Sequence, residues 1–179
     1  MITAPRPWTR AELARLPDDT NRYEVLDGEL LVTPLYSPRH QFIARDLAVA
    51  LQRYCDQHGI GTLVAPGTVV FGANELQPDV LLTPGPEPAL ESRWEDLPLP
   101  LLVAEVESDV TVRRDRGIKA DAYRRIGIPT YWAVDAVHRS VLVFTPESEE
   151  PATVTGVLSW RPRGDIPALE IPIATLLGP

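Results

Sequence analysis

The sequence contains a single cysteine, Cys55, among its 179 residues. One thiol cannot close an internal disulfide, and it cannot build a zinc site from several cysteines. Such a composition is typical of proteins that work in a reducing compartment, so we expect a cytoplasmic location.

Long hydrophobic runs and two common catalytic motifs are also missing. No stretch approaches the roughly 20 apolar residues that a membrane-spanning helix needs, and residues 1–10 lack the apolar core of a signal peptide. Neither the G-x-S-x-G pattern of serine hydrolases nor a P-loop occurs. We therefore expect a soluble protein without a membrane partner, and we exclude these two kinds of catalysis.

Positive charge is scarce, because 17 Lys and Arg face 25 Asp and Glu and the formal net charge is -8 at pH 7. This balance argues against a protein that coats DNA through charge alone. The exception is residues 113–125, which include six basic and two acidic residues. A solvated helix face is the favoured explanation of such a window, and a surface for a phosphate backbone is the alternative. Arg113, Arg114 and Arg116 are our candidates for nucleic-acid contacts.

Length and local patterns predict one domain, residues 1–179, of α/β (α+β) class. The run Y-E-V-L-D-G-E-L-L-V predicts an N-terminal β-hairpin with its Asp-Gly turn at residues 27–28. Serine followed by proline at residues 37–38 is typical of a helix start. Apolar residues then recur at helical spacing until Gly59, where we expect that helix to end.

The middle of the chain alternates between strand-like and helix-like patterns. Short β-prone runs follow Gly61, namely T-L-V-A, T-V-V-F and D-V-L-L-T. A proline-rich loop at residues 84–98 precedes L-L-V-A-E-V-E, whose unbroken apolar start predicts a buried central strand. A helix between Thr111 and Gly127 comes next, and then the strand-like runs T-Y-W-A-V-D and V-L-V-F. This order predicts a central mixed β-sheet flanked by helices.

Acidic residues stand on two strands of this predicted sheet. Asp79 begins one of them, and Glu105 lies late in the next. If the strands are neighbours, the two carboxylates are held rigidly together, and Mg²⁺ commonly takes one or two carboxylates with water and substrate as its other ligands. A metal ion there would activate water and neutralise the charge that grows on a phosphate. Asp79 and Glu105 are therefore candidate catalytic residues and ligands for Mg²⁺ or Mn²⁺.

Glu107 and Lys119 are further candidates near that pair. Strand alternation puts Glu105 and Glu107 on one face, so these acids are either loaded with a cation or exposed to solvent. Helical spacing aligns Asp115, Lys119 and Tyr123. The Lys119 ammonium can position the attacking water, but the spacing is equally compatible with a surface ion pair to Asp115 worth roughly 0.2–0.5 kcal/mol.

Several segments, taken in order, resemble a known superfamily. They are Q-P-D at 77–79, V-A-E-V at 103–106, D-R-G-I-K at 115–119 and Y-R-R-I-G-I-P-T-Y-W-A-V-D at 123–135. They resemble the PD-(D/E)XK restriction-endonuclease-like superfamily, and most of all its large bacterial branch of restriction endonucleases of poorly known function. R-Y-E-V-L-D-G-E at 22–29 and S-P-R-H-Q at 37–41 resemble the same branch.

This resemblance implies a restriction-endonuclease-like core with a divalent-metal nuclease site in which Asp79 and Glu105 are the two metal-binding acids. The commonest form of the superfamily has a lysine two residues after the second acid, where this chain has Glu107. The role of that lysine is then expected to pass to Lys119 on the following helix. Glu107 becomes either a third metal ligand or an exposed residue without a role, and we favour the second alternative.

Glu24 and His40 also lie in the matching segments, which makes them candidate accessory residues. The resemblance suggests a metal contact for Glu24, although an acid on a hairpin strand is more often solvated. A histidine early in a helix commonly caps the helix or packs against its neighbours, so His40 also has a purely structural alternative.

The leading hypothesis is a Mg²⁺-dependent endonuclease that cleaves DNA, acting as a homodimer because cutting both strands usually needs two copies. One alternative is a degenerate nuclease fold that binds nucleic acid or a protein partner, which the negative net charge and Glu107 both favour. Another uses Glu105 with Glu107, or Asp79, as an acid pair for glycoside hydrolysis. Only this last activity would survive EDTA.

Overall fold

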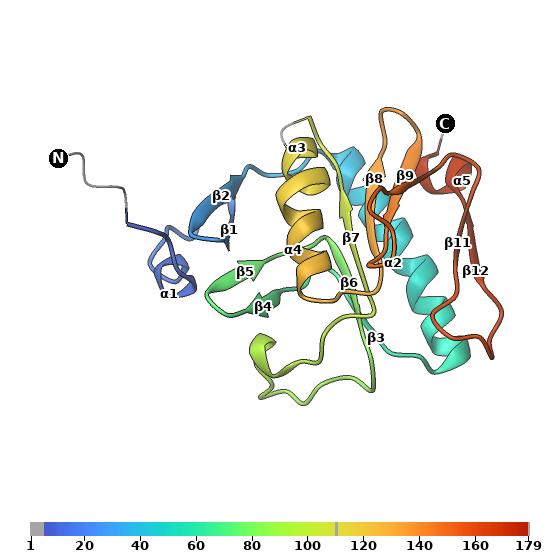
Figure 1. Ribbon diagram of the computed structural model, residues 1–179, viewed down its shortest axis with the longest axis horizontal. Helices are drawn as coiled ribbons and strands as arrows, with labels where there is room; N and C mark the ends of the chain where they lie inside the picture. Colours follow the sequence, from blue (N-terminus) through green and yellow to red (C-terminus); the bar gives the residue numbers. More distant parts are fainter. Residues whose placement is uncertain (1–5, 110, 179) are drawn as a thin grey trace.

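The computed structural model describes residues 6–109 and 111–178, and its centre is a six-stranded sheet. The strand order is β10-β9-β8-β7-β6-β3, and helices lie on both faces (Figure 1). The strands are β3 Thr62–Val64, β6 Val80–Thr83, β7 Leu102–Val106, β8 Tyr131–Asp135, β9 Ser140–Phe144 and β10 Ala152–Val154. β7 and β8 are parallel, whereas the other neighbours are antiparallel. The predicted mixed sheet flanked by helices is confirmed.

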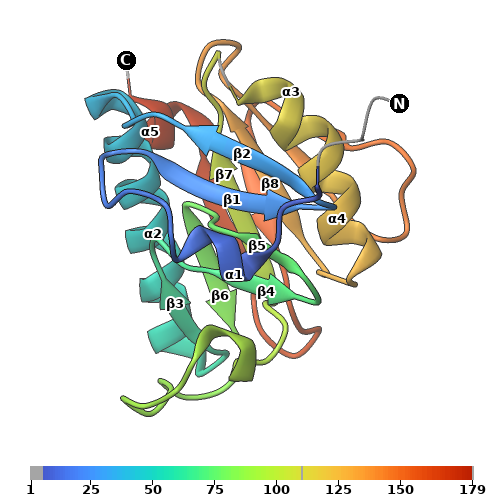
Figure 2. The ribbon, with the colours of Figure 1, turned by 90° about the vertical axis from the view of Figure 1, so that its left-hand side faces the viewer.

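A second sheet, in the order β2-β1-β5-β4, is built on the N-terminal hairpin. Its strands are β1 Arg22–Leu26, β2 Glu29–Thr33, β4 Val69–Phe71 and β5 Asn74–Leu76. The hairpin turn places Asp27 at φ 50° and Gly28 at φ 86°, a left-handed geometry that Asp-Gly sequences adopt readily. Figure 2 shows the hairpin crossing in front of the large sheet, between α2 on one side and α4 on the other. The hairpin was predicted, whereas β5 was not.

The long helix α2, Pro38–His58, begins and ends where the sequence predicts. The Ser37 side chain accepts a hydrogen bond from the backbone N–H of His40, and Pro38 occupies the first helical position. Gly59 closes the helix in the left-handed conformation, with φ 59°. A shorter helix, α1 Arg10–Leu13, precedes the hairpin, and a single 3₁₀ turn, η1 Trp94–Asp96, lies in the proline-rich loop.

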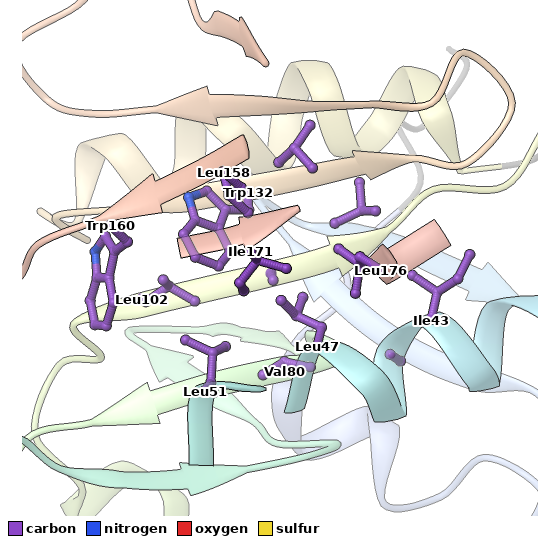
Figure 3. Close-up of a cluster of buried hydrophobic side chains, with 14 of the residues drawn as sticks. Ile43, Leu47, Leu51, Val80, Leu102, Trp132, Leu158, Trp160, Ile171 and Leu176 are labelled. Carbon is purple, nitrogen blue, oxygen red and sulfur yellow. The ribbon is translucent and has the colours of Figure 1, made fainter. Parts of the chain in front are cut away.

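One face of the large sheet packs against α2. Ile43, Leu47 and Leu51 of this helix meet Val80, Leu102 and Trp132 of the sheet (Figure 3). The C-terminal elements join the same cluster, and they are β11 Val157–Trp160, β12 Leu169–Pro172 and α5 Ile173–Leu177. This core holds β6 and β7 rigidly from one side.

A continuous helical segment and the hairpin sheet cover the opposite face. The segment consists of α3 Val112–Arg114, a π-helical turn η2 Asp115–Lys119 and α4 Ala120–Arg125. Tyr123 of this segment, Val103 of β7 and Leu26 of the hairpin share a second hydrophobic cluster. π-Helical turns occur frequently at functional sites, and this one contains Lys119. Within residues 6–109 and 111–178, no helix combines the length and hydropathy that crossing a membrane requires.

Leu47→Ala is expected to lower the free energy of unfolding by about 2–5 kcal/mol, because Leu47 is 0 % exposed at the centre of the α2 core and its truncation leaves a cavity. Urea denaturation followed by circular dichroism measures this loss. Val49 lies on the same helix with 43 % exposure, so Val49→Ala should change the free energy of unfolding by no more than about 0.5 kcal/mol. Equal effects of the two substitutions would contradict this packing.

Candidate active site

Asp79 and Glu105 are brought together by the pairing of β6 with β7. These strands are antiparallel neighbours in which Val80 pairs with Ala104, so Asp79, one residue before β6, stands level with Glu105. Both carboxylates are nearly buried, with exposures of 7 % and 1 %, on the face away from α2. Asp79 Oδ2 accepts a hydrogen bond of 2.7 Å from the backbone N–H of Val106. The strands that carry the two acids are therefore neighbours, as the metal-site hypothesis requires.

Lys119 reaches this pair from the π-helical turn. Its Nζ lies 2.7 Å from Glu105 Oε1, 2.9 Å from Glu24 Oε1 and 3.7 Å from Asp115 Oδ1. Tyr123, on the same helical face, donates a hydrogen bond of 3.2 Å to Glu105 Oε1. Lys119 is only 1 % exposed, so the alternative of a surface ion pair with Asp115 is wrong.

The hairpin contributes Glu24 and Arg22, whose side chains lie on one face of β1. Glu24 is fully buried rather than solvated, and its Oε1 accepts a 2.8 Å hydrogen bond from the backbone N–H of Gln77. The Arg22 guanidinium lies between three carboxylates: Nη1 is 3.1 Å from Asp79 Oδ1, Nη2 is 3.5 Å from Glu105 Oε2 and Nε is 3.8 Å from Glu24 Oε2. Arg22 was not among the predicted site residues.

His40 extends the cluster from the first turn of α2. Its Nε2 lies 3.0 Å from Asp79 Oδ2, at ion-pair distance but outside hydrogen-bond alignment. The Tyr36 ring stacks on the His40 ring at 3.6 Å, with 5° between the planes. The guanidinium of Arg22 lies over the Tyr36 ring at 4.8 Å. Tyr36 thus lies against the side chains of Arg22 and His40, which both contact Asp79. His40 therefore packs against an aromatic ring and also belongs to the site.

Burial and the two cations act in opposite directions on the acids. Burial raises the pKa of Glu105 to about 8, although Lys119 and Arg22 oppose this rise. Burial would also raise the pKa of Asp79, but His40 and Arg22 outweigh it and hold that pKa below its usual value. Burial lowers the pKa of Lys119, yet the surrounding Glu105, Glu24 and Asp115 raise it above its usual value, so the ammonium stays charged.

Glu107 is neither exposed nor part of the Asp79–Glu105 cluster. Arg116 donates two hydrogen bonds to it, from Nε at 2.7 Å and from Nη2 at 2.6 Å. The same Nη2 also contacts Asp135 Oδ2 at 2.5 Å, and the side chain of Glu107 is only 4 % exposed. The expectation of an exposed residue without a role is wrong, because Glu107 fastens the end of β7 to the helical segment through Arg116.

Glu107→Gln is expected to lower the free energy of unfolding by about 1 kcal/mol, because it removes the charge from a bidentate pair whose arginine is partly exposed to solvent. Its Mg²⁺ affinity, measured by calorimetry, should stay within twofold of that of the wild type. A tenfold weaker affinity would instead make Glu107 a metal ligand.

The three arginines proposed to contact nucleic acid have different surroundings. Arg116 is engaged by Glu107 and Asp135, as described above. Arg114 donates hydrogen bonds to the Val32 carbonyl at 3.3 Å and to Thr33 Oγ1 at 3.1 Å, so it ties the helical segment to β2. Arg113 is the exposed member of the three. The predicted basic surface is thus largely used in internal contacts.

A groove of about 720 Å³ lies beside the carboxylate cluster, between the hairpin side of the molecule and α2. Its lining includes Arg22, Asp79 and Gln77, together with Tyr36 and Arg45. A substrate in this groove could therefore reach Asp79 without any rearrangement of the core.

The oxygen ligands of the cluster fit a hard divalent cation in their chemistry. Glu24 Oε2 is buried and has no hydrogen-bond partner, so it is available to a cation. In the part of the chain that the structure describes, however, no group of three or more His, Cys, Asp or Glu residues is arranged around a single metal position. Arg22 and Lys119 lie among the acids instead. Because Mg²⁺ often takes only one or two carboxylates, the pair Asp79 and Glu105 still fits it.

Sequence reasoning missed Arg22, Tyr36 and Asp115 as members of the cluster. A signal for Arg22 was available, because it precedes Glu24 by two residues on a predicted strand and must share its face. Tyr36 lies in a loop and carries no comparable signal. Lys119 has a signal of its own, since it is the only lysine in a chain whose other basic residues are arginines.

Comparisons with known proteins bear on both family and fold. Residues 10–174 match the model of the Uma2 family, which is described as "Putative restriction endonuclease". The fold is similar to that in the crystal structure of "a putative nuclease belonging to DUF820 from Anabaena variabilis ATCC 29413". That likeness has a TM-score of 0.73 at 15 % sequence identity and covers 96 % of this chain and 98 % of that chain. Among curated proteins, none matches this sequence.

Proposed function

Because the chain belongs to the Uma2 family, described as "Putative restriction endonuclease", we propose that it is a Mg²⁺- or Mn²⁺-dependent endonuclease that hydrolyses DNA phosphodiester bonds. The observation that carries this proposal is the buried cluster of Glu24, Asp79 and Glu105, opposed by Lys119, in which Asp79 lines an open groove. Burying several acids together costs free energy unless a cation compensates their charge, so such a cluster favours the binding of a cation.

Each residue of the cluster has a distinct part in this proposal. Asp79 and Glu105 would hold the metal, and Glu24 would pair with Lys119 beside them. A bound Mg²⁺ supplies Lewis-acid charge to phosphodiester hydrolysis. Lys119 contacts Oε1 of both Glu24 and Glu105, so it places a positive charge against one oxygen of each acid and leaves Oε2 of each directed elsewhere. Tyr123 fixes the same Glu105 oxygen through its hydroxyl group.

Cleavage of a supercoiled plasmid in Mg²⁺ tests the proposal. Nicked and linear DNA are the expected products, and EDTA should stop their formation, which also separates this activity from metal-free glycoside hydrolysis. Asp79→Asn should remove cleavage, whereas Asp121→Asn, which changes an exposed acid on α4, should retain it. Cleavage that persists in EDTA, or in Asp79→Asn, would rule out this assignment. Labelled RNA in place of the plasmid shows whether RNA is cleaved as well.

A nuclease-like fold that binds DNA or a protein without cutting is the second candidate. The observation that favours it is that Arg22 and Lys119 already place two positive charges among the acids. Calorimetry that detects no Mg²⁺ or Mn²⁺ binding, with DNA binding retained in fluorescence anisotropy, would support this candidate over the nuclease.

A homodimer remains part of the proposal, because one site of this size cuts one strand at a time. Light scattering on the chain alone and with a DNA duplex measures its state of association. A protein that stays monomeric on DNA and produces only nicked plasmid would contradict this part, while leaving the nuclease assignment intact.

A further inference from the structure

The three carboxylates of the cluster each direct one oxygen toward a fixed partner of the protein. Glu24 Oε1 and Glu105 Oε1 both contact Lys119 Nζ, at 2.9 and 2.7 Å. Asp79 Oδ2 accepts a hydrogen bond of 2.7 Å from the backbone N–H of Val106. These three oxygens are therefore already bound by groups of the protein.

The other oxygen of each carboxylate faces Arg22. Asp79 Oδ1, Glu105 Oε2 and Glu24 Oε2 lie 3.1, 3.5 and 3.8 Å from three different nitrogens of its guanidinium. Close arginine–carboxylate pairs have separations of about 2.7–2.9 Å, so at least two of these contacts are loose. Glu24 Oε2 and Arg22 Nε are both buried without a hydrogen-bond partner, although they face each other. The guanidinium therefore neutralises these oxygens without saturating them.

We propose that Arg22 is an internal counter-ion that occupies the cation position of this cluster, and that a divalent metal binds there only by displacing its guanidinium. This inference rests on the proposed function, because it concerns the same site, but it assigns a role to a residue outside the metal-binding pair. Arg22 is 12 % exposed in its side chain and lines the groove together with Tyr36, so the displaced guanidinium can move into the groove. One delocalised positive charge spread over three oxygens is a weaker partner for them than a compact divalent ion.

If the metal displaces Arg22, the observed free energy of metal binding is the difference between the interactions of the acids with the metal and their interactions with the guanidinium. The metal gains carboxylate oxygens of Asp79 and Glu105, and the protein loses the contacts of Arg22 with the same oxygens. Removing the guanidinium should therefore tighten metal binding, although removal of an ordinary arginine from an acidic surface should have little effect. The direction of this change distinguishes a competitor from a residue that helps to bind the metal.

Calorimetry with MgCl₂ and with MnCl₂, on the full chain without DNA, measures this difference. Arg22→Met should bind each ion at least tenfold more tightly than the wild type. Each metal should also raise the melting temperature of Arg22→Met by more than it raises that of the wild type. The matched control is Arg10→Met, which removes an arginine paired with Glu75 and Glu95 rather than with the acids of the cluster, and it should keep the wild-type affinity. An affinity of a folded Arg22→Met that equals or falls below that of the wild type overturns the inference.

A second measurement keeps the test valid if Arg22→Met folds poorly. In wild-type crystals soaked with MnCl₂, anomalous density should appear between Asp79 and Glu105, with the Arg22 guanidinium moved away from both. Manganese bound while Arg22 still contacts both acids would contradict displacement and leave the nuclease proposal standing. Absence of metal binding in wild type, Arg22→Met and soaked crystals alike would overturn metal use itself, and the inference with it.

Discussion

Lys119→Met is expected to reduce DNA cleavage by about 10²–10³-fold or more and to lower the free energy of unfolding by about 3–5 kcal/mol. Both losses have one cause. The ammonium is 1 % exposed and lies within 2.9 Å of Glu24 and Glu105, so its removal leaves two buried acids without their closest cation. Methionine retains the length of lysine up to Cε and fits an apolar environment, so the loss reports mainly the missing charge rather than a large cavity.

Two further variants separate charge from packing. Lys119→Met combined with Glu24→Gln removes one acid together with the cation, and it should recover part of the lost stability. Arg125→Met removes a cation of the same helical segment that pairs with Asp27 on the hairpin, but both partners of that ion pair are more than half exposed. It should therefore keep cleavage and change the free energy of unfolding by about 1 kcal/mol or less. Urea denaturation and plasmid cleavage below the melting temperature of each variant measure the two effects.

The sequence alone predicts a different outcome for Lys119, namely loss of cleavage with folding largely intact. That expectation treats the lysine as a residue on a helix surface that leans over a strand end. Its contact with Asp115 at 3.7 Å is the spacing-derived pair, but the contacts with Glu24 and Glu105 are shorter, and they come from two different sheets. A stable Lys119→Met that still cuts DNA would exclude both the structural and the functional role.

Features with a local signal were predictable in this chain. The Asp27-Gly28 turn, the start of α2 at Ser37 and the end of α2 at Gly59 each depend on a few adjacent residues whose backbone preferences are strong. The pairing of β6 with β7 was a hypothesis from the acids they carry, and the register of Val80 with Ala104 confirms it. In contrast, β5 is a strand of three residues with no apolar alternation, and it forms because β4 and β1 are available to pair with it.

Features that need two sheets to meet were not predictable. Arg22 and Glu24 lie on the hairpin, whereas Asp79 and Glu105 lie on the large sheet, and only the packing of one sheet on the other brings them together. Glu107 illustrates the same limit, because strand alternation correctly relates it to Glu105 but cannot show that Arg116, nine residues later, is its partner. The ion-pair partners of charged residues are the least predictable part of the site, because they depend on how distant segments of the chain pack together.

Glu105→Gln is expected to lose cleavage to an extent comparable with Lys119→Met, but without the loss of stability. The amide keeps the shape of the side chain but cannot supply a negative charge to a cation, so cleavage should again fall by about 10²–10³-fold or more. Stability should not fall with it. Burial raises the pKa of Glu105 to about 8 from an ordinary value near 4.5, so ionising this group in the folded protein is unfavourable.

The pH dependence of stability follows from that pKa. Between pH 4.5 and about 8 the folded protein binds a proton at Glu105 that the unfolded chain has released, so the contribution of this group to stability is full at low pH and declines as the pH rises through about 8. Glu105→Gln removes the decline. In urea denaturation without metal, its free energy of unfolding should fall less than that of the wild type between pH 5 and pH 8.5, whereas Asp121→Asn, at an exposed position, should retain the wild-type profile. An equal decline in Glu105→Gln and the wild type would mean that Glu105 is ionised throughout this range, stabilised by Lys119 and Arg22, and that the cluster carries its full negative charge before any metal arrives.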